Sequence, residues 1–300
     1  MKMLKVVEKR RSVREYKEKE FEGKDLELIK EYISDLPQIV ENVTVKATLL
    51  EGTQVFEWLN GLAGYNGIMI KAPYYITLTS KIADNQQHLK AAGYAGEWLV
   101  LNVTKHDIAT CWVSTNQKEA DIHKTLGLPV EEEIIGLIAL GYAKGDMRVS
   151  NIYKNQGIDN ADRVRAYQHV DSEYRDAPIS GRLSIEEVVY LKQWGQNASI
   201  EELDVLGFTE VFYYMRLAPS TANKQPWRFV VDKDQFVLVM SKDDGYEDDR
   251  LACIEAGIAM LYFEVAMHGE GFPGRWLYDS VANRYNIPET HFIAGVYRFQ

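Results

Sequence analysis

The sequence predicts an α+β fold made of two related halves in one chain. Its 300 residues are enough for two domains of ordinary size. The first observation is an internal repeat: Ala92-Gly93 and Ala256-Gly257 lie 164 residues apart, and each opens a mostly apolar stretch with helical spacing. The second is that β-rich runs come before and after both apolar stretches. Together they predict one small sheet and one buried helix in each half.

Other landmarks occur in the same order in both halves. Trp112 and Trp276 follow the two apolar stretches and are also 164 residues apart. The remaining pairs are Ser80-Lys81 with Ser241-Lys242 at the ends of β-rich runs, Leu126 to Pro129 with Tyr285 to Pro288, and the strand-like runs Ile134 to Leu140 and Phe292 to Tyr297. Chance similarity between two apolar helices is the alternative explanation.

These landmarks predict the order helix, strand, buried helix, short helix, strand in each half. We expect a first half at 1–150, a connection at 151–183 and a second half at 184–300. The connection is polar and includes Gly157, Pro178 and Gly181. A connection this long would let the halves pack face to face, as an intrachain pseudo-dimer.

Composition limits the kinds of partner. A net charge of −10 argues against nucleic acid or an anionic membrane as the main partner, because both need an electropositive face. No apolar run approaches the roughly 18 residues that cross a bilayer, and no signal peptide is visible. Two cysteines form no disulfide framework, so we expect a cytoplasmic protein. No metal-binding motif is present in the sequence.

A basic segment near the N-terminus is the first candidate site. If Arg10-Arg11-Ser12-Val13-Arg14 is extended, the side chains of Arg10, Ser12 and Arg14 project on one face. Two guanidinium groups beside a hydroxyl would suit a phosphate. The alternative is a solvated surface stretch.

The second candidate is a loop at Pro219 to Gln225. We expect a helix to end before Pro219, Gln225 to be extended because it precedes Pro226, and a strand to begin at Trp227. Such a loop displays amide and hydroxyl groups that suit the edge of a planar heteroaromatic ring. An ordinary helix-to-strand loop is the alternative.

Both segments resemble motifs of the nitroreductase superfamily. The pattern Pro-Ser-x-x-Asn-x-Gln-Pro-Trp-x-Phe is matched at Pro219, Ser220, Asn223, Gln225, Pro226, Trp227 and Phe229, and Arg10 to Tyr16 resembles the N-terminal Arg-Arg-Ser-x-Arg-x-aromatic signature. The resemblance implies an FMN cofactor. It implies phosphate contacts from Arg10, Arg11, Ser12 and Arg14, and flavin contacts from the Pro219 loop through Ser220 and Asn223. Gln225 would shape the loop or touch the ring.

The distribution of the two motifs predicts one composite site. In the family's homodimers, FMN takes its phosphate contacts from one subunit and its loop contacts from the other. Here the first half has Leu36 to Thr44 in place of the loop, without the Asn or the Gln-Pro-Trp. The second half has the loop but no Arg-x-Ser-x-Arg before it. We therefore expect one FMN per chain and a monomer that acts as a pseudo-dimer.

The resemblance also implies three further flavin contacts in the first half. Trp112 and Val113 would lie beside the flavin ring, although Trp112 could equally be a core residue. Asn66 would meet the flavin edge, and a turn next to Gly67 is the alternative. Lys144 and Arg148 are weaker candidates for phosphate contacts.

The function that the resemblance implies is an FMN-dependent oxidoreductase of the nitroreductase type. Hydride would pass from NAD(P)H through FMN to an electron-poor small-molecule acceptor, such as a nitroaromatic or a quinone, in ping-pong fashion. Because the cofactor carries the reaction, we name no catalytic side chain and no metal. Two alternatives remain, a flavin-binding or storage protein with little turnover and a duplicated scaffold for a different ligand.

Overall fold

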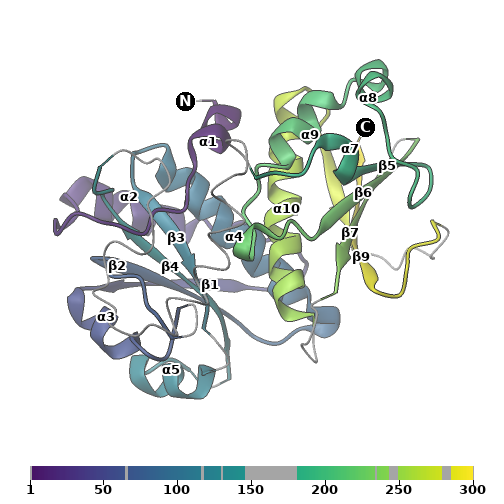
Figure 1. Cartoon of the computed structure of the whole chain (residues 1–300). Coiled ribbons are helices and arrows are strands. Elements are labelled where there is room, and N and C mark those ends of the chain that lie inside the picture. Colours follow the sequence, from purple (N-terminus) through teal and green to yellow (C-terminus); the bar gives the residue numbers. More distant parts are fainter. Residues whose placement is uncertain are drawn as a thin grey trace, which may run out of the picture. The chain divides into compact units, whose positions relative to one another are not determined.

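The chain divides into two compact units (Figure 1). The computed structural model describes residues 2–64, 67–115, 118–129, 131–145, 181–233, 235–242, 249–278 and 285–299. Unit 1 comprises Met1–Glu8, Leu89–Glu97 and Pro178–Gln300, and unit 2 comprises Lys9–His88 and Trp98–Ala177. Most of the expected connection at 151–183 lies outside the described residues. The expected division at 150 and 184 stays a prediction.

Unit 2 is built on a four-stranded antiparallel sheet with the order β1-β2-β4-β3. Its strands are β1 (Val45–Glu51), β2 (Tyr74–Ser80), β3 (Ala109–Val113) and β4 (Glu133–Gly141). Its helices are α2 (Gly23–Ser34), α3 (Thr53–Leu59), α5 (Glu119–Leu126) and the second part of α4 (Gln87–Thr104), with the 3-10 turn η1 (Asp84–Gln86) before α4.

The sheet of unit 2 is buried on both faces. Leu137 and Ala139 of β4 belong to one apolar cluster with residues of α3 and α5. Ile138 and Leu140 belong to another, with residues of α2 and α4. Side chains alternate between the faces of a strand, so β4 serves both clusters and is apolar throughout.

Unit 1 is built on a five-stranded sheet with the order β5-β6-β7-β9-β8. Its strands are β5 (Val189–Leu191), β6 (Trp227–Asp232), β7 (Gln235–Ser241), β8 (Gly274–Leu277) and β9 (His291–Phe299). Its helices are α7 (Ile185–Val188), α8 (Ile200–Leu206), α9 (Thr209–Met215) and α10 (Arg250–Gly269), with the 3-10 turn η3 (Thr221–Asn223). Helix α1 (Met3–Lys9) starts the chain in this unit. Among the described strands of this unit, only β5 pairs in parallel, with β6.

An aromatic cluster joins α10 to this sheet. Phe263 of α10 stacks on Phe229 of β6 with ring centroids 4.7 Å apart, and lies 5.0 Å from Phe236 of β7 and 5.2 Å from Tyr297 of β9. All four side chains are completely buried. Rings of this size dominate the buried apolar surface, so this contact fixes α10 on the sheet.

The two sheets confirm the duplication that the sequence predicts. The order β1-β2-β4-β3 is repeated as β6-β7-β9-β8, with every neighbouring pair antiparallel. A β-bulge follows Leu78 in the first sheet and Leu238 in the second, and these residues pair with Gly136 and Gly295. A bulge in the same place in both sheets indicates two copies of one structural unit.

The two tryptophans of the repeat lie in edge strands, which the sequence reading did not recognise as strands. The ring of Trp112 in β3 covers Gly136, and the ring of Trp276 in β8 covers Gly295, at 3.2 and 3.3 Å from the position that a β-carbon would take. In both units, therefore, the lack of a side chain at the glycine leaves space for the tryptophan ring.

Helices α4 and α10 cross at two glycines inside unit 1. A β-carbon on Gly257 would lie 1.9 Å from the carbonyl oxygen of Lys90, and one on Gly93 would lie 1.9 Å from that of Ile254. Lys90 and Ile254 are 164 residues apart, like the two glycines. The contact is therefore reciprocal, as in an isologous interface. Only glycine lets two helix backbones approach this closely.

Buried polar groups complete the crossing. Lys90 Nζ donates to the carbonyl oxygen of Ala294, 3.1 Å away, which is the unpaired residue of the β9 bulge. Burial lowers the pKa of Lys90, because the ammonium loses water. Tyr262 Oη donates to Glu97 Oε1 at 3.0 Å, and both residues are fully buried. Each group has a hydrogen-bond partner, as burial requires.

By length and composition, helix α10 could cross a membrane, since its mean hydropathy is 1.4 over 18 residues. The expectation that no apolar run approaches this length is therefore wrong. Of that 18-residue window, 72% is buried inside the structure. Its apolar character is explained by its contacts with the sheet and with α4.

We predict that Gly257→Ala destabilises the protein. In an exposed helix this change stabilises by up to about 1 kcal/mol. Here the new methyl group would overlap the Lys90 carbonyl, so we expect a loss of about 3 kcal/mol in the free energy of unfolding, measured by urea denaturation. Gly93→Ala should have a similar effect.

Gly23→Ala, at the start of α2, is the matched control, since a β-carbon there meets nothing within 4 Å. Its free energy of unfolding should be unchanged or slightly higher. Equal effects of Gly23→Ala and Gly257→Ala would show that the crossing tolerates a side chain.

Candidate functional site

The arginine segment lies along the outer edge of β3 in unit 2. Ser12 forms a parallel β-bridge with Thr110, and Val13 N donates to Thr110 O at 2.9 Å. Tyr16 Oη donates to the carbonyl oxygens of Val13 at 2.6 Å and Ala139 at 3.2 Å. The segment is therefore held to β3 by backbone contacts and to β4 by the Tyr16 hydroxyl.

The guanidinium groups of Arg10 and Arg14 both contact Ser12. Arg10 Nη2 donates to Ser12 Oγ at 3.2 Å, Arg14 Nη1 to Ser12 O at 3.5 Å, and Arg11 Nη1 to Arg10 O at 2.8 Å. Arg10 is only 6% exposed, so this part of the segment is not a solvated surface. Burial raises the pKa of Tyr16 well above its usual value, while Arg14 and Arg10 act to lower it. The donors fit a phosphate group.

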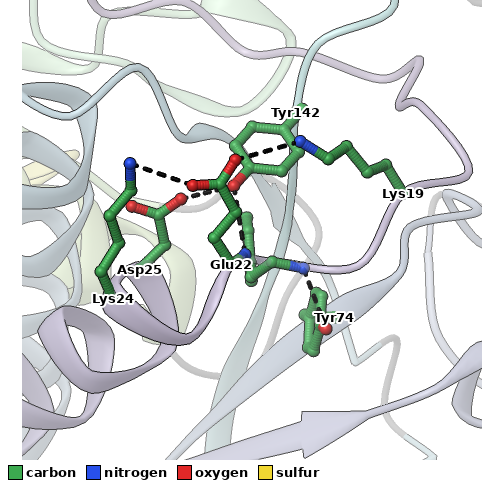
Figure 2. Close-up of polar contacts among 7 residues, drawn as sticks. Lys19, Glu22, Lys24, Asp25, Tyr74 and Tyr142 are labelled. Carbon is green, nitrogen blue, oxygen red and sulfur yellow. Dashed lines mark hydrogen bonds and ion pairs between the residues drawn. The ribbon is translucent and has the colours of Figure 1, made fainter.

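A second anchor follows the arginines (Figure 2). Glu22 lies between Lys19 and Lys24, with N–O distances of 3.3 and 3.0 Å. Hydrogen bonds from Lys24 and Lys19 lower the pKa of Glu22. Tyr142, just after β4, donates its hydroxyl to Asp25, and Lys19 Nζ lies 4.9 Å from the Tyr142 ring centroid. The segment is thus fastened to the sheet again at this end.

The outer edge of β3 also meets the loop that carries Asn66. Gly64 N donates to Ser114 O at 2.7 Å, whereas Val13 N binds Thr110 O. Because backbone groups alternate between the two edges of an antiparallel strand, the N–H and C=O of Trp112 face the same edge as those of Thr110 and Ser114. The structure therefore brings the arginine segment and the Trp112 backbone to one edge. Asn66 itself lies outside the described residues.

The side chains of Trp112 and Val113 pack into the core. The Trp112 ring packs against the cluster of α2 and α4, and Val113, only 4% exposed, belongs to the cluster of α3 and α5. Trp112 is only partly buried, whereas Val113 can reach a ligand mainly through its backbone groups. The role predicted for these residues stays a prediction.

In unit 1, the Pro219 loop is held by its own polar side chains. Gln225 N donates to Ser220 Oγ at 2.9 Å, and Asn223 Nδ2 donates to Gly181 O at 2.7 Å. The Gln225 amide donates to Gly181 O at 3.1 Å and to Asn223 O at 3.0 Å, and it accepts from Leu183 N at 2.9 Å. Gln225 is 4% exposed, so its amide shapes the loop.

The predicted extended conformation of Gln225 is wrong. Its φ is +50°, in the left-handed region, and Ala222 and Asn223 have φ values of +50° and +55°. Pro226 disfavours the right-handed helical region for Gln225, and its three side-chain hydrogen bonds select the left-handed one over the extended one. Each such non-glycine residue costs on the order of 1 kcal/mol, so this loop needs strong anchors.

Two polar groups of the loop remain available to a ligand. Ser220 accepts from Gln225 N, and its hydroxyl hydrogen has no acceptor within the described part of the chain. Asn223 uses Nδ2 on Gly181 O, and its Oδ1 has no donor among the described residues. One donor and one acceptor fit the edge of a heteroaromatic ring that carries both kinds of group.

Two residues that the sequence reading missed also hold this loop. Glu255 Oε1 accepts from Thr221 N at 2.5 Å, and Arg182 donates to the carbonyl oxygens of Leu217 and Ala218. Glu255 is the only charged residue between Leu251 and Phe263 in an apolar helix. A single charge in such a segment indicates a buried polar contact and could have predicted this role. No sequence pattern predicts the role of Arg182, because its contacts with the loop join residues that are about 35 positions apart in the sequence.

The duplicated α+β units, the arginine segment and the Pro219 loop are together typical of nitroreductase-like proteins. The sequence profile of a family described as "Putative TM nitroreductase" matches residues 2–267. The chain belongs to this family.

The fold of one solved structure agrees with this assignment. A "putative nitroreductase" from Thermotoga maritima MSB8 has a TM-score of 0.56 at 15% identity, and the match covers 100% of this chain and 93% of that chain. A nitroreductase with bound FMN from Bacteroides fragilis NCTC 9343 has a TM-score of 0.42 at 24% identity, over 53% of this chain and 97% of that chain. No curated protein matches.

We predict that Gln225→Ala destabilises unit 1. It would remove the three hydrogen bonds that the Gln225 amide makes with the partly buried backbone groups of Gly181, Leu183 and Asn223, so the free energy of unfolding should fall by about 3 kcal/mol. The exposed Lys224→Ala is the control and should change it by less than about 0.5 kcal/mol. Similar values for the two variants in urea denaturation would contradict the role of Gln225.

Proposed function

We propose that this chain binds one FMN and is an FMN-dependent oxidoreductase. The observation that carries the proposal is the gathering of Arg10 and Arg14 at Ser12, in a chain whose net charge is −10 and which belongs to a nitroreductase family. Guanidinium groups beside a hydroxyl offer planar, charged donors of the kind that bind the phosphate of FMN.

Two groups of residues would bind different parts of FMN. Arg10, Arg11, Ser12 and Arg14 would hold the phosphate, while Ser220 and Asn223 would bind the ring edge through the donor and acceptor described above. Gln225 would keep the loop in shape. That both segments serve the same FMN rests on the motifs, since each is present only once in the sequence.

When bound, FMN supplies the redox chemistry, a two-electron transfer from NAD(P)H to an electron-poor small molecule such as a nitroaromatic or a quinone. The chain's own task is to bind the phosphate, orient the ring and leave one ring face accessible. We assign no side-chain acid or base. The donor, the acceptor, the monomeric state and the cytoplasmic location are part of this proposal.

We predict about one FMN per chain, measured from the visible spectrum of the protein after saturation with FMN. Arg14→Ala should raise the Kd for FMN by about tenfold or more, because a charged hydrogen bond is lost, but should leave the Kd for riboflavin, which has no phosphate, unchanged. Asn223→Ala should weaken the binding of both FMN and riboflavin.

Lys17→Ala removes the same charge from an exposed neighbouring position and is the matched control. If it weakens FMN binding as much as Arg14→Ala does, the loss of affinity comes from the change in net charge and not from a phosphate site. No FMN uptake by the wild-type protein would reject the flavin assignment. FMN binding without oxidation of NAD(P)H in the presence of a nitroaromatic or a quinone would favour a storage role.

A further inference from the structure

Glu255 is a buried carboxylate aimed at the Pro219 loop from helix α10. It is 4% exposed, and Oε1 accepts the backbone N–H of Thr221 at 2.5 Å. Carboxylate acceptors make shorter and stronger hydrogen bonds than neutral acceptors do. Burial of a carboxylate is costly, so its place in an otherwise apolar helix segment calls for a reason.

Thr221 occupies the place in the loop where an anchor has most effect. It opens the turn η3 and lies between Ser220 and Asn223, whose side chains offer the available donor and acceptor. Directly after it, Ala222 and Asn223 both have positive φ. An unsupported loop would leave these conformations, because left-handed backbone is unfavourable for side-chain-bearing residues.

The position of Glu255 is itself fixed by the helix crossing. It lies two residues before Gly257, where the backbone of α10 touches that of α4. The close packing of the two backbones at this point restricts movement of α10 toward α4. The carboxylate is therefore presented from a rigid support, as a binding site requires.

We propose that Glu255 is a positioning residue for the flavin: by holding Thr221 N–H it keeps Ser220 and Asn223 in the geometry that binds FMN. The inference rests on the proposed function. It adds that the affinity of the loop for the ring depends on a residue that does not touch the ring. Gln can keep the oxygen acceptor at the same place, whereas Ala cannot.

The first test needs no cofactor. Hydrogen–deuterium exchange of the flavin-free full chain should be faster in the peptide that covers Pro219 to Gln225 in Glu255→Ala than in the wild type. Glu255→Gln should restore slow exchange. Wild-type exchange in Glu255→Ala would overturn the proposal, because the loop would then hold its shape without the carboxylate.

The second test measures FMN binding by fluorescence titration. Glu255→Ala should raise the Kd by about tenfold, and Glu255→Gln should stay within about threefold of the wild type. Ile258→Val, also buried on α10, is the control for lost packing and should leave the Kd unchanged. An equal rise in Ile258→Val, or no rise in Glu255→Ala, would overturn the inference and leave the flavin function intact.

Absence of FMN binding by the wild type is a different result. It would reject the proposed function, and the positioning role with it, even if the exchange experiment showed that Glu255 holds the loop.

Discussion

The contact between α4 and α10 at Gly93 and Gly257 is the constraint on which unit 1 depends. Carbonyl oxygens of one helix occupy the space where the other would carry a β-carbon. This contact fixes the position of α10. In that position Phe263 packs against aromatic side chains of the sheet. The same position puts Glu255 within hydrogen-bond distance of the Pro219 loop. One close approach therefore fixes the packing of α10 and places one of the anchors of the loop.

The two sheets are alike in the features that pack them, and they differ in the loops that precede their first antiparallel strands. Both sheets share strand order, bulge and the tryptophan that covers a glycine. The loops that precede β1 and β6 differ completely. In the first, Val40 and Val43 are buried and apolar, whereas the second is held by the polar side chains of Ser220, Asn223 and Gln225. Loops tolerate such divergence because the sheet does not depend on them.

Much of the fold could be predicted from the sequence because its signals are local and periodic. The apolar stretches after Gly93 and Gly257 are long enough to show helical spacing, and the run from Tyr74 has the composition of a buried strand. The edge strands that hold Trp112 and Trp276 are only five and four residues long, too short for their pattern to be distinguished from a loop. Gln225 was misjudged because the effect of Pro226 is local, while the hydrogen bonds that decide its conformation come from Gly181 and Leu183.

By itself the sequence determined the family and the duplication, and it supplied the residues that we propose as ligand contacts. These follow from residue types and their spacing, which the fold does not alter. Only the tertiary structure decided how those residues are used. It buries Arg10 against Ser12, packs the Trp112 ring against the core, and commits the Gln225 amide to the loop's own backbone. It also brings in Glu255, because a hydrogen bond across 34 residues of sequence exists only after α10 has packed. Contacts of this kind depend on distances in space, and sequence spacing does not contain them.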